Sequence, residues 1–184
     1  MRNRMTLRVP TGHRNAERGF TLIELLIVVA IILIIAAIAI PSYLRSKMAA
    51  NESSAVEHVR AITTAATAYN IAWSNGYPPD FPTMGGAGVV ASCTQALLLD
   101  PNITAAPHLK SGYVFSYTGM GGNTPVVPGC VRGFYGYLAT AVPSIPGSTG
   151  MRSFCSDLPG VIHFDLTGAA IASIPACDAL PAIQ

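Results

Sequence analysis

An almost unbroken apolar run from Phe20 to Ile40 constrains the fold of this chain more than any other feature. A helix rises about 1.5 Å per residue, so a run of this length reaches roughly 30 Å and can cross the hydrocarbon core of a bilayer. The run carries a single charged residue, Glu24, near its start. Because a charge at mid-membrane costs about 2.5 to 3.5 kcal/mol on insertion scales, Glu24 requires a partner that a plain membrane anchor does not provide.

The residues before Glu24 indicate what that partner is. Cleavage between Gly19 and Phe20 would create an α-amino group four residues before Glu24. Residues four apart lie on the same face of a helix, and the helix dipole favours a negative charge in the first turn. The amine is either that of the same chain or that of a neighbouring copy. Between copies, the pair would neutralise two charges inside an apolar bundle and fix the axial register of each subunit.

The stretch from Arg18 to Glu24, Arg-Gly-Phe-Thr-Leu-Ile-Glu, closely resembles the class III signal of type IV pilins and of the related pseudopilins of type II secretion. In that family a prepilin peptidase cuts after the glycine and methylates the new N-terminal phenylalanine. The resemblance implies that Gly19 is the cleavage residue, Phe20 the methylated terminus and Glu24 the assembly glutamate. It also implies an α+β fold, in which one long N-terminal helix packs on a C-terminal antiparallel β-sheet.

Two simpler interpretations of the apolar run explain less of the sequence. An ordinary secretory signal has a shorter apolar region and a small-residue cleavage site, here one after Ala39. A plain signal anchor fits the length and the basic flank, but it leaves Glu24 and the junction between Gly19 and Phe20 unexplained. We therefore favour the pilin-like interpretation.

The charge distribution predicts the orientation of the chain in a membrane. Five arginines and one glutamate precede Phe20 and give that segment a charge of +4. The whole chain carries +2, so the part from Phe20 onward carries −2. Because positive residues that flank a span stay in the cytoplasm, we expect residues 1–19 inside and everything after Ile40 outside. The total charge gives no reason to expect a specific nucleic-acid partner.

The predicted organisation has a boundary at Pro41. In a continuing helix, Pro41 removes the hydrogen bond to the Ala37 carbonyl and kinks the turn, whereas the alternative is that the helix ends there. The predicted parts are a cleaved leader (1–19), a transmembrane and filament-core helix (20–40), an amphipathic helix half (41–74) and an extracytoplasmic globular domain (75–184). Within that domain, residues 75–111 form a loop-rich connection, and residues 112–184 hold an antiparallel sheet and a disulfide-bounded C-terminal region.

Apolar residues after Pro41 recur at spacings of three and four, which predicts an amphipathic helix whose stripe packs on a sheet. Charged residues such as Glu52 are assigned to the other faces. Alanines such as Ala65 and Ala68 would allow another helix to approach closely. With the apolar run, this predicts one helix of about 50 residues. The stripe consists of Ala55, Val59, Ile62, Ala66, Tyr69 and Trp73.

Turn residues and alternating side chains predict the rest of the secondary structure. Asn75 and Gly76 end the helix, and Ser92 is predicted to cap a short helix over Cys93–Leu99. Asp157–Gly160 is predicted to form the turn before the last main strand. The predicted strands are Tyr113–Thr118, Phe134–Val142, Arg152–Cys155 and Val161–Leu166, with a weaker edge strand at Ala170–Ile174.

All four cysteines lie in the part predicted to be extracytoplasmic, where an even count indicates two disulfides. Three pairings are possible. We favour Cys93 with Cys130 and Cys155 with Cys177, since each bridge then closes a sequential loop. The second bridge resembles the C-terminal disulfide-bounded loop of many type IV pilins. No cysteine or histidine pair has metal-ligand spacing, so we predict neither a metal site nor a cofactor.

No catalytic constellation is recognisable, and we expect a structural protein rather than an enzyme. The resemblance implies a subunit of a homopolymeric type IV pilus that serves surface functions such as motility, adhesion or DNA uptake. Its expected partners are other copies, the prepilin peptidase, an inner-membrane assembly platform and the cytoplasmic ATPase of that platform. The precursor would lie in the bacterial inner membrane and the filament outside the cell.

Two alternative functions remain open. The first is a pseudopilin of a type II secretion system, and the second is a membrane-anchored binding protein that does not polymerise. Glu24 argues against the second alternative. The length, the four cysteines and the absence of a calcium-loop pattern favour a pilin over a pseudopilin. The acids that would have to form such a loop are dispersed at Asp157, Asp165 and Asp178.

Overall fold

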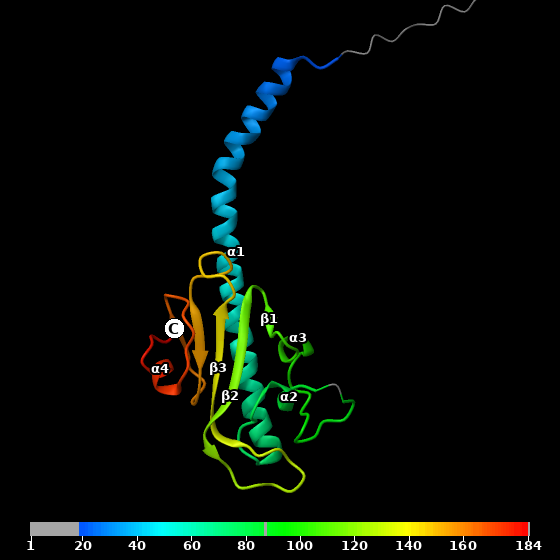
Figure 1. Cartoon of the computed structure of the whole chain (residues 1–184), viewed down its shortest axis with the longest axis vertical. Coiled ribbons are helices and arrows are strands. Elements are labelled where there is room, and N and C mark those ends of the chain that lie inside the picture. Colours follow the sequence, from blue (N-terminus) through cyan, green and yellow to red (C-terminus); the bar gives the residue numbers. More distant parts are fainter. Residues whose placement is uncertain (1–18, 87, 184) are drawn as a thin grey trace, which may run out of the picture. The chain divides into compact units, whose positions relative to one another are not determined.

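The computed structural model of the protein describes residues 19–86 and 88–183. All of the predicted leader except Gly19 therefore lies outside the described residues. The chain divides into two compact units, Met1–Pro41 and Ser42–Gln184. Helix α1 (Leu22–Trp73) contributes to both units, and the other described helices and strands belong to the second (Figure 1).

Helix α1 has 52 residues and runs through Pro41, which confirms the prediction of one long helix. The alternative of a helix end at Pro41 is wrong. In the second unit the predicted stripe faces the core, although Trp73 at its end is only half-buried. The centroids of the Trp73 and Tyr69 rings are 4.9 Å apart. The remaining stripe residues are fully buried, namely Ala55, Val59, Ile62, Ala66 and Tyr69.

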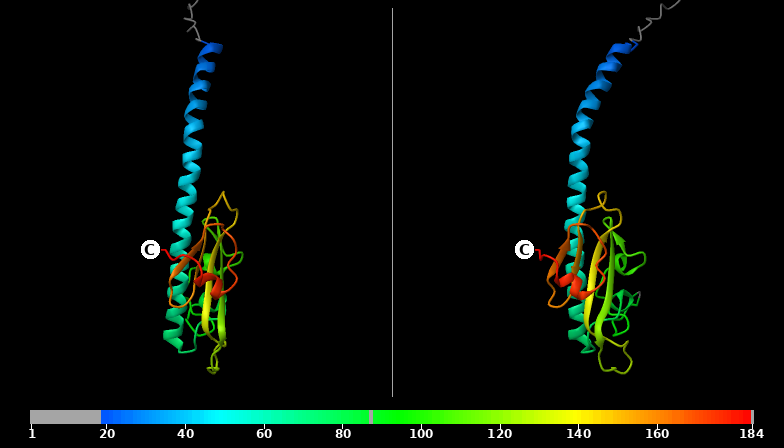
Figure 2. Two further views of the ribbon diagram at one scale, coloured as in Figure 1. Left: turned by 90° about the vertical axis from the view of Figure 1, so that its left-hand side faces the viewer. Right: turned by 60° about the vertical axis from the view of Figure 1, so that its left-hand side comes forward.

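The second unit contains one antiparallel sheet of five strands in the order β1-β2-β3-β4-β5. Along the second strand, the side chains of Tyr113, Phe115 and Tyr117 are buried and alternate with exposed ones. These rings form one apolar core with the stripe of α1, and Figures 1 and 2 show the sheet lying along this part of the helix. The α+β fold is therefore confirmed. The strands are β1 (Leu109–Lys110), β2 (Tyr113–Asn123), β3 (Phe134–Pro143), β4 (Ser153–Ser156) and β5 (Ile162–Asp165).

Three short helices interrupt the connections, and each begins at a side chain that caps it. Asp80, Asp100 and Ser173 accept hydrogen bonds from the first backbone N–H groups of these helices, which have no partner inside the helix. A proline follows each cap and fits there because it lacks an N–H group. The helices are α2 (Phe81–Met84), α3 (Pro101–Thr104) and α4 (Ile174–Asp178).

The predicted helix over Cys93–Leu99 is wrong. Ser92 and Gln95 instead form a β-bridge around a tight turn. The following N–H groups bond to carbonyls of the α2 segment rather than to their own turn, as when Ala96 donates to Thr83 at 2.8 Å. Leu97 has a positive φ of 54°, which no helix accommodates. Backbone partners far away in the sequence thus replace the local ones.

The predicted edge strand at Ala170–Ile174 is also wrong, because Ser173 begins α4 at that point. The free edge of β5 is covered by the C-terminal residues instead. Phe164 donates its N–H to the Pro181 carbonyl at 3.0 Å, and Ile183 donates to Ile162 at 2.8 Å. The predicted turn before β5 is present, with the Gly160 N–H bonded to the Asp157 carbonyl.

Two disulfides hold the second unit, and they have the pairing favoured from the sequence. Cys93 pairs with Cys130, and Cys155 pairs with Cys177. The first bridge is half-buried and joins the α2–α3 connection to the β2–β3 connection. The second is fully buried and fastens α4 to β4.

Glu52 is buried, although its charge had assigned it to a solvent-facing side of the helix. Its carboxylate accepts the Met151 and Arg152 backbone N–H groups and forms an ion pair of 2.7 Å with the Arg152 guanidinium. Burial acts to raise the pKa of Glu52, but these hydrogen bonds and the Arg152 charge outweigh it and lower the pKa. The pair therefore ties α1 to the segment before β4.

Candidate assembly site at the start of the long helix

Thr21 and Glu24 form a reciprocal cap at the start of α1. The Thr21 hydroxyl oxygen accepts the Glu24 N–H at 3.3 Å, and the Thr21 N–H donates to Oε2 of Glu24 at 2.9 Å. The Thr21 hydroxyl also donates to the same Oε2 at 2.7 Å. A threonine followed three residues later by glutamate is a known N-terminal signature of helices, so the sequence held the signal for this role of Thr21. Our sequence analysis missed it.

The cap uses one oxygen atom of the Glu24 carboxylate and leaves the other available. All the hydrogen bonds to the side chain end at Oε2. Within the described part of the chain, Oε1 has no hydrogen-bond donor. A carboxylate accepts several hydrogen bonds, so Oε1 can bind a further donor while Oε2 keeps the cap.

The surface of α1 in the first unit is apolar on every side. Phe20 is 83% exposed, and the helix from Leu22 to Ile40 has no buried residue. Among the described residues, one helix is long and apolar enough to cross a membrane, and its apolar window lies in this segment. A helix that is apolar all round is stable only where lipid or other protein covers it. The described residues do not provide that cover.

Pro41 lies inside α1 at the boundary between the two units. Having no N–H group, it cannot donate to the Ala37 carbonyl, so one rung of the helical hydrogen-bond ladder is absent. The helix continues past this point, and the predicted kink stays a prediction.

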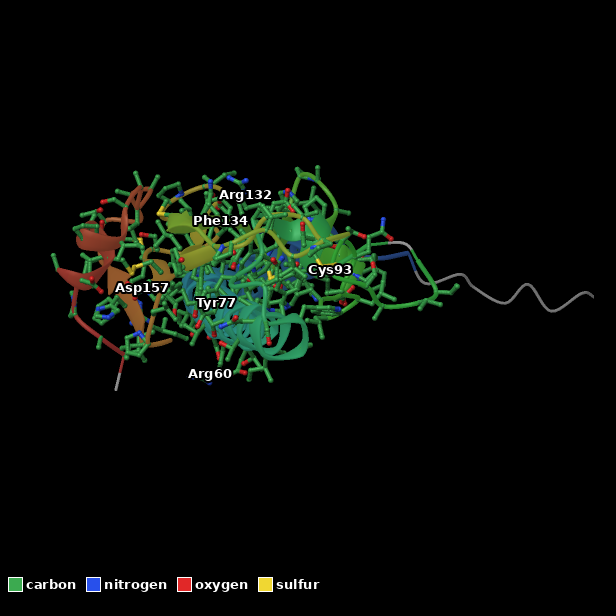
Figure 3. The ribbon with its side chains drawn as sticks, turned by 90° about the horizontal axis from the view of Figure 1, so that it is seen from below. Arg60, Tyr77, Cys93, Arg132, Phe134 and Asp157 are labelled. Carbon is green, nitrogen blue, oxygen red and sulfur yellow. A yellow bond between two sulfur atoms is a disulfide. The ribbon has the colours of Figure 1, made fainter. Side chains whose placement is uncertain are left out.

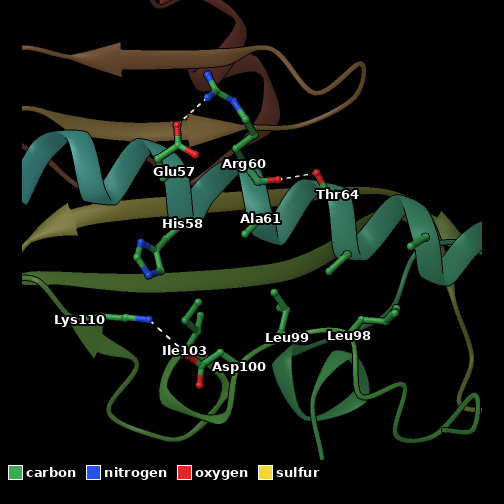
Figure 4. A pocket seen from close by; sticks show the side chains of 12 residues that line it. Glu57, His58, Arg60, Ala61, Thr64, Leu98, Leu99, Asp100, Ile103 and Lys110 are labelled. Carbon is green, nitrogen blue, oxygen red and sulfur yellow. Dashed lines mark hydrogen bonds and ion pairs between the residues drawn. The ribbon is translucent and has the colours of Figure 1, made fainter.

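In the second unit, α1 presents a face of small side chains to an open groove of about 690 Å³. Figure 4 shows this groove between the helix and residues 98–110. Ion pairs lie along it on both sides, from Arg60 to Glu57 at 2.8 Å and from Lys110 to Asp100 at 3.4 Å. The small helix residues that line the groove are Ala61, Thr64, Ala65 and Ala68. The predicted alanine-rich face is thus partly open to solvent.

The described residues bring together no group of three or more histidine, cysteine, aspartate or glutamate side chains that could hold a metal ion. The described histidines instead bond to nearby carbonyls. His108 contacts the Ile103 carbonyl at 2.9 Å, and His163 contacts the Leu180 carbonyl at 2.7 Å. These contacts give the two histidine rings a structural role within the fold.

Comparison with known proteins locates the similarity in the N-terminal segment. Residues 14–40 match the family model described as the prokaryotic N-terminal methylation motif. The chain is 53% identical over 49 residues to the type IV major pilin protein PilA of Myxococcus xanthus. It is 57% identical over 51 residues to fimbrial proteins of Pseudomonas aeruginosa.

These alignments cover only part of each protein. They include 27% and 28% of this chain, and they span 22% of the Myxococcus protein and 33% of each Pseudomonas protein. No solved structure matches the chain significantly. Type IV pilins are structural subunits rather than enzymes. The methylation motif and these relatives make the N-terminal segment of the chain similar to that of type IV pilins, and a long helix on an antiparallel sheet is consistent with that similarity.

Proposed function

We propose that the chain is a structural subunit of a type IV pilus and polymerises through the N-terminal part of α1. The observation that carries this proposal is the exposed apolar surface from Leu22 to Ile40 with one carboxylate, Glu24, near its start. In a filament the apolar surfaces of neighbouring helices cover one another. The segment then exchanges contact with lipid for contact with protein, which its uniform apolar surface permits.

In this proposal the chain matures in the inner membrane. The basic leader, residues 1–19, stays in the cytoplasm until the prepilin peptidase cuts after Gly19 and methylates Phe20. An assembly platform in the inner membrane and its cytoplasmic ATPase then extract the subunit into the growing filament. The mature protein ends up on the outside of the cell.

The cap at the start of α1 gives Glu24 two tasks that do not conflict. In the membrane, Oε2 accepts the hydrogen bonds from Thr21, which lowers the cost of holding a carboxylate near the apolar core. After cleavage, the new amine of Phe20, from the same chain or a neighbouring one, can bind the free Oε1. The absent backbone bond at Pro41 would let the helix bend or extend as the subunit enters the filament.

Replacing Glu24 by alanine tests the assembly step. We expect Glu24→Ala to be cleaved normally but to be absent from filaments, since the amine of Phe20 would lose its partner in an apolar bundle. The measurement is the amount of the subunit in sheared filaments and in membranes, together with its N-terminal sequence. Glu57→Ala, which removes an exposed glutamate, is the matched control and should assemble. Normal filaments from Glu24→Ala would contradict the charge-pairing mechanism.

The mass of the unaltered protein tests the processing step. A chain that begins with N-methylated Phe20 and is abundant in the sheared fraction supports a pilus. A chain with the same terminus that stays in the membrane fraction would instead indicate the short pseudopilus of type II secretion. A chain that begins at Met1, or one cut after Ala39, would overturn the proposal in favour of an anchored or secreted domain.

A further inference from the structure

A second cavity lies at the far end of α1, within the second unit and outside the assembly segment. Its volume is about 360 Å³, near the lower end of the 300–1,000 Å³ typical of small-molecule sites. Figure 3 looks onto this end of the unit and labels Tyr77 and Phe134. Two segments near the end of α1 line one side, namely the end of the helix (Asn70, Ser74) and the turn after it (Gly76, Tyr77). The other lining residues belong to the β2–β3 connection (124–127) and to the start of β3 (Phe134, Tyr135).

The backbone holds these walls in fixed positions. Tyr77 and Phe134 exchange two backbone hydrogen bonds of 2.8 and 2.9 Å, which place their side chains on neighbouring chain segments. The Thr124 hydroxyl donates to the Asn75 carbonyl at 2.8 Å and fixes the opposite wall. A side chain at Gly76 would come within 2.6 Å of the Phe134 carbonyl oxygen, so this close packing requires glycine there. The cavity is therefore part of the fold and not a gap between loose loops.

The lining combines aromatic faces with unused polar groups. Tyr135 is 58% exposed and lines the cavity together with Tyr77 and Phe134. Across the described residues, the side chains of Asn70, Ser74 and Tyr135 form no hydrogen bond with any other residue. They offer one amide and two hydroxyl groups to a ligand.

The backbone conformation of Ser74 is a further observation in favour of a binding site here. Its φ is +49°, a left-handed conformation that glycine adopts at lower cost at the end of a helix. The turn therefore gives no reason for a serine at this position. Ser74 is one of the residues that line the cavity.

No charged residue lines the cavity. A ligand that matches the lining is neutral, has one apolar face for the aromatic rings and carries several hydroxyl groups for the amide and hydroxyls. A pyranose ring has this combination, because the C–H groups of one face are attracted to the negative face of an aromatic ring while its hydroxyls point outward. We propose that this cavity binds a single neutral hexopyranose unit. The proposal does not depend on filament assembly.

The test is ligand-observed saturation-transfer NMR on the full chain, solubilised in a detergent without a sugar head group. The probes are methyl β-D-galactopyranoside and methyl β-D-glucopyranoside, with methyl β-D-glucuronoside as the charged comparison. We expect at least one neutral glycoside to bind and the glucuronoside to bind more weakly, since nothing in the lining compensates a negative charge.

Two variants locate the binding. Tyr135→Ala and Asn70→Ala each remove one contact from the wall and should weaken binding about tenfold. Tyr43→Ala removes another exposed tyrosine, outside the cavity, and should leave binding unchanged. Failure of both neutral glycosides to bind would overturn the proposal. So would binding that neither wall variant weakens, or equal binding of the glucuronoside.

Discussion

The two parts of α1 are the same kind of helix but depend on different partners. From Leu22 to Ile40 every side of the helix is open and apolar, and the described residues provide nothing to cover it. From Glu52 to Tyr69 one side is buried in a core shared with the sheet, while the other side is polar or small. The comparison teaches that continuous helical structure does not imply a common source of stability. The second part is stabilised by its own chain, whereas the described residues leave the first part without cover.

The second part of α1 is also braced by bonds that the first part lacks. An ion pair joins Glu52 to Arg152, and the Tyr69 hydroxyl donates to the Cys93 carbonyl at 2.6 Å, beside a disulfide. The only side-chain bonds described at the start of the helix are those of the cap between Thr21 and Glu24. Changes in the second part should therefore affect folding, and changes in the first part should affect assembly.

The largest effect on stability is expected from a pair of matched isoleucine substitutions. Ile62 is fully buried, so Ile62→Ala should lower the free energy of unfolding by about 4 kcal/mol through lost burial and a residual cavity. Ile32 is 57% exposed, and Ile32→Ala should change it by less than about 0.5 kcal/mol. Denaturant unfolding of the solubilised chain measures both. Equal losses in the two variants would abolish the distinction between the two parts of the helix.

Removing a disulfide is expected to have the next largest effect. The bridges close loops with sequence separations of 37 and 22 residues, so replacing either cysteine pair by alanines should cost about 3.5 kcal/mol in the loop-entropy model. Under a mild thiol reductant, the half-buried Cys93–Cys130 should open before the buried Cys155–Cys177, because reduction requires access. Mass spectrometry after alkylation reports the order. Opening of Cys155–Cys177 first would show that this region is more open than the structure indicates.

A smaller effect is expected for Glu52→Gln, at about 2 kcal/mol near neutral pH, because Arg152 would lose a charged partner but stays partly exposed. The pKa of Glu52 is lowered in the folded state, so its contribution is present above the unfolded-state pKa and is lost as the pH falls through the folded-state value. Denaturant unfolding of the unaltered protein and of Glu52→Gln, at pH values from about 7 to 3, measures this contribution. The difference between them should shrink towards acid, and a constant difference would rule out the charge as its source.

The elements predictable from the sequence are those with local causes. Hydrophobic periodicity gave the stripe from Ala55 to Tyr69, and alternation located the four longer strands. The burial of Glu52 was missed because its partner, Arg152, lies 100 residues away. The spacing did hold a hint, since Glu52 precedes Ala55 by three residues and so shares its face. The segment after Ser92 was missed for the same reason, because its hydrogen-bond partners belong to the α2 region.

In the candidate assembly site, too, some features were predictable from the sequence and others were not. The roles of Gly19, Phe20 and Glu24 come from a resemblance over a short stretch, and they remain predictions. The cap by Thr21 is local and was readable from the spacing to Glu24. The sugar cavity was not readable, because segments distant in the sequence, such as Asn70 and Tyr135, meet only in the fold.

The smallest effect is expected at Thr21, where a substitution separates the two tasks assigned to Glu24. Thr21→Val keeps the size of the side chain but removes the hydroxyl that caps α1, at a cost of about 1 kcal/mol to the first turn. The carboxylate would still be free to bind the amine of Phe20. We therefore expect the domain to unfold as before and filaments to form in reduced amount, whereas Glu24→Ala forms none. The measurement is again the subunit recovered from sheared filaments. If Thr21→Val abolished assembly as completely as Glu24→Ala, the cap rather than the charge pair would be the step that assembly requires.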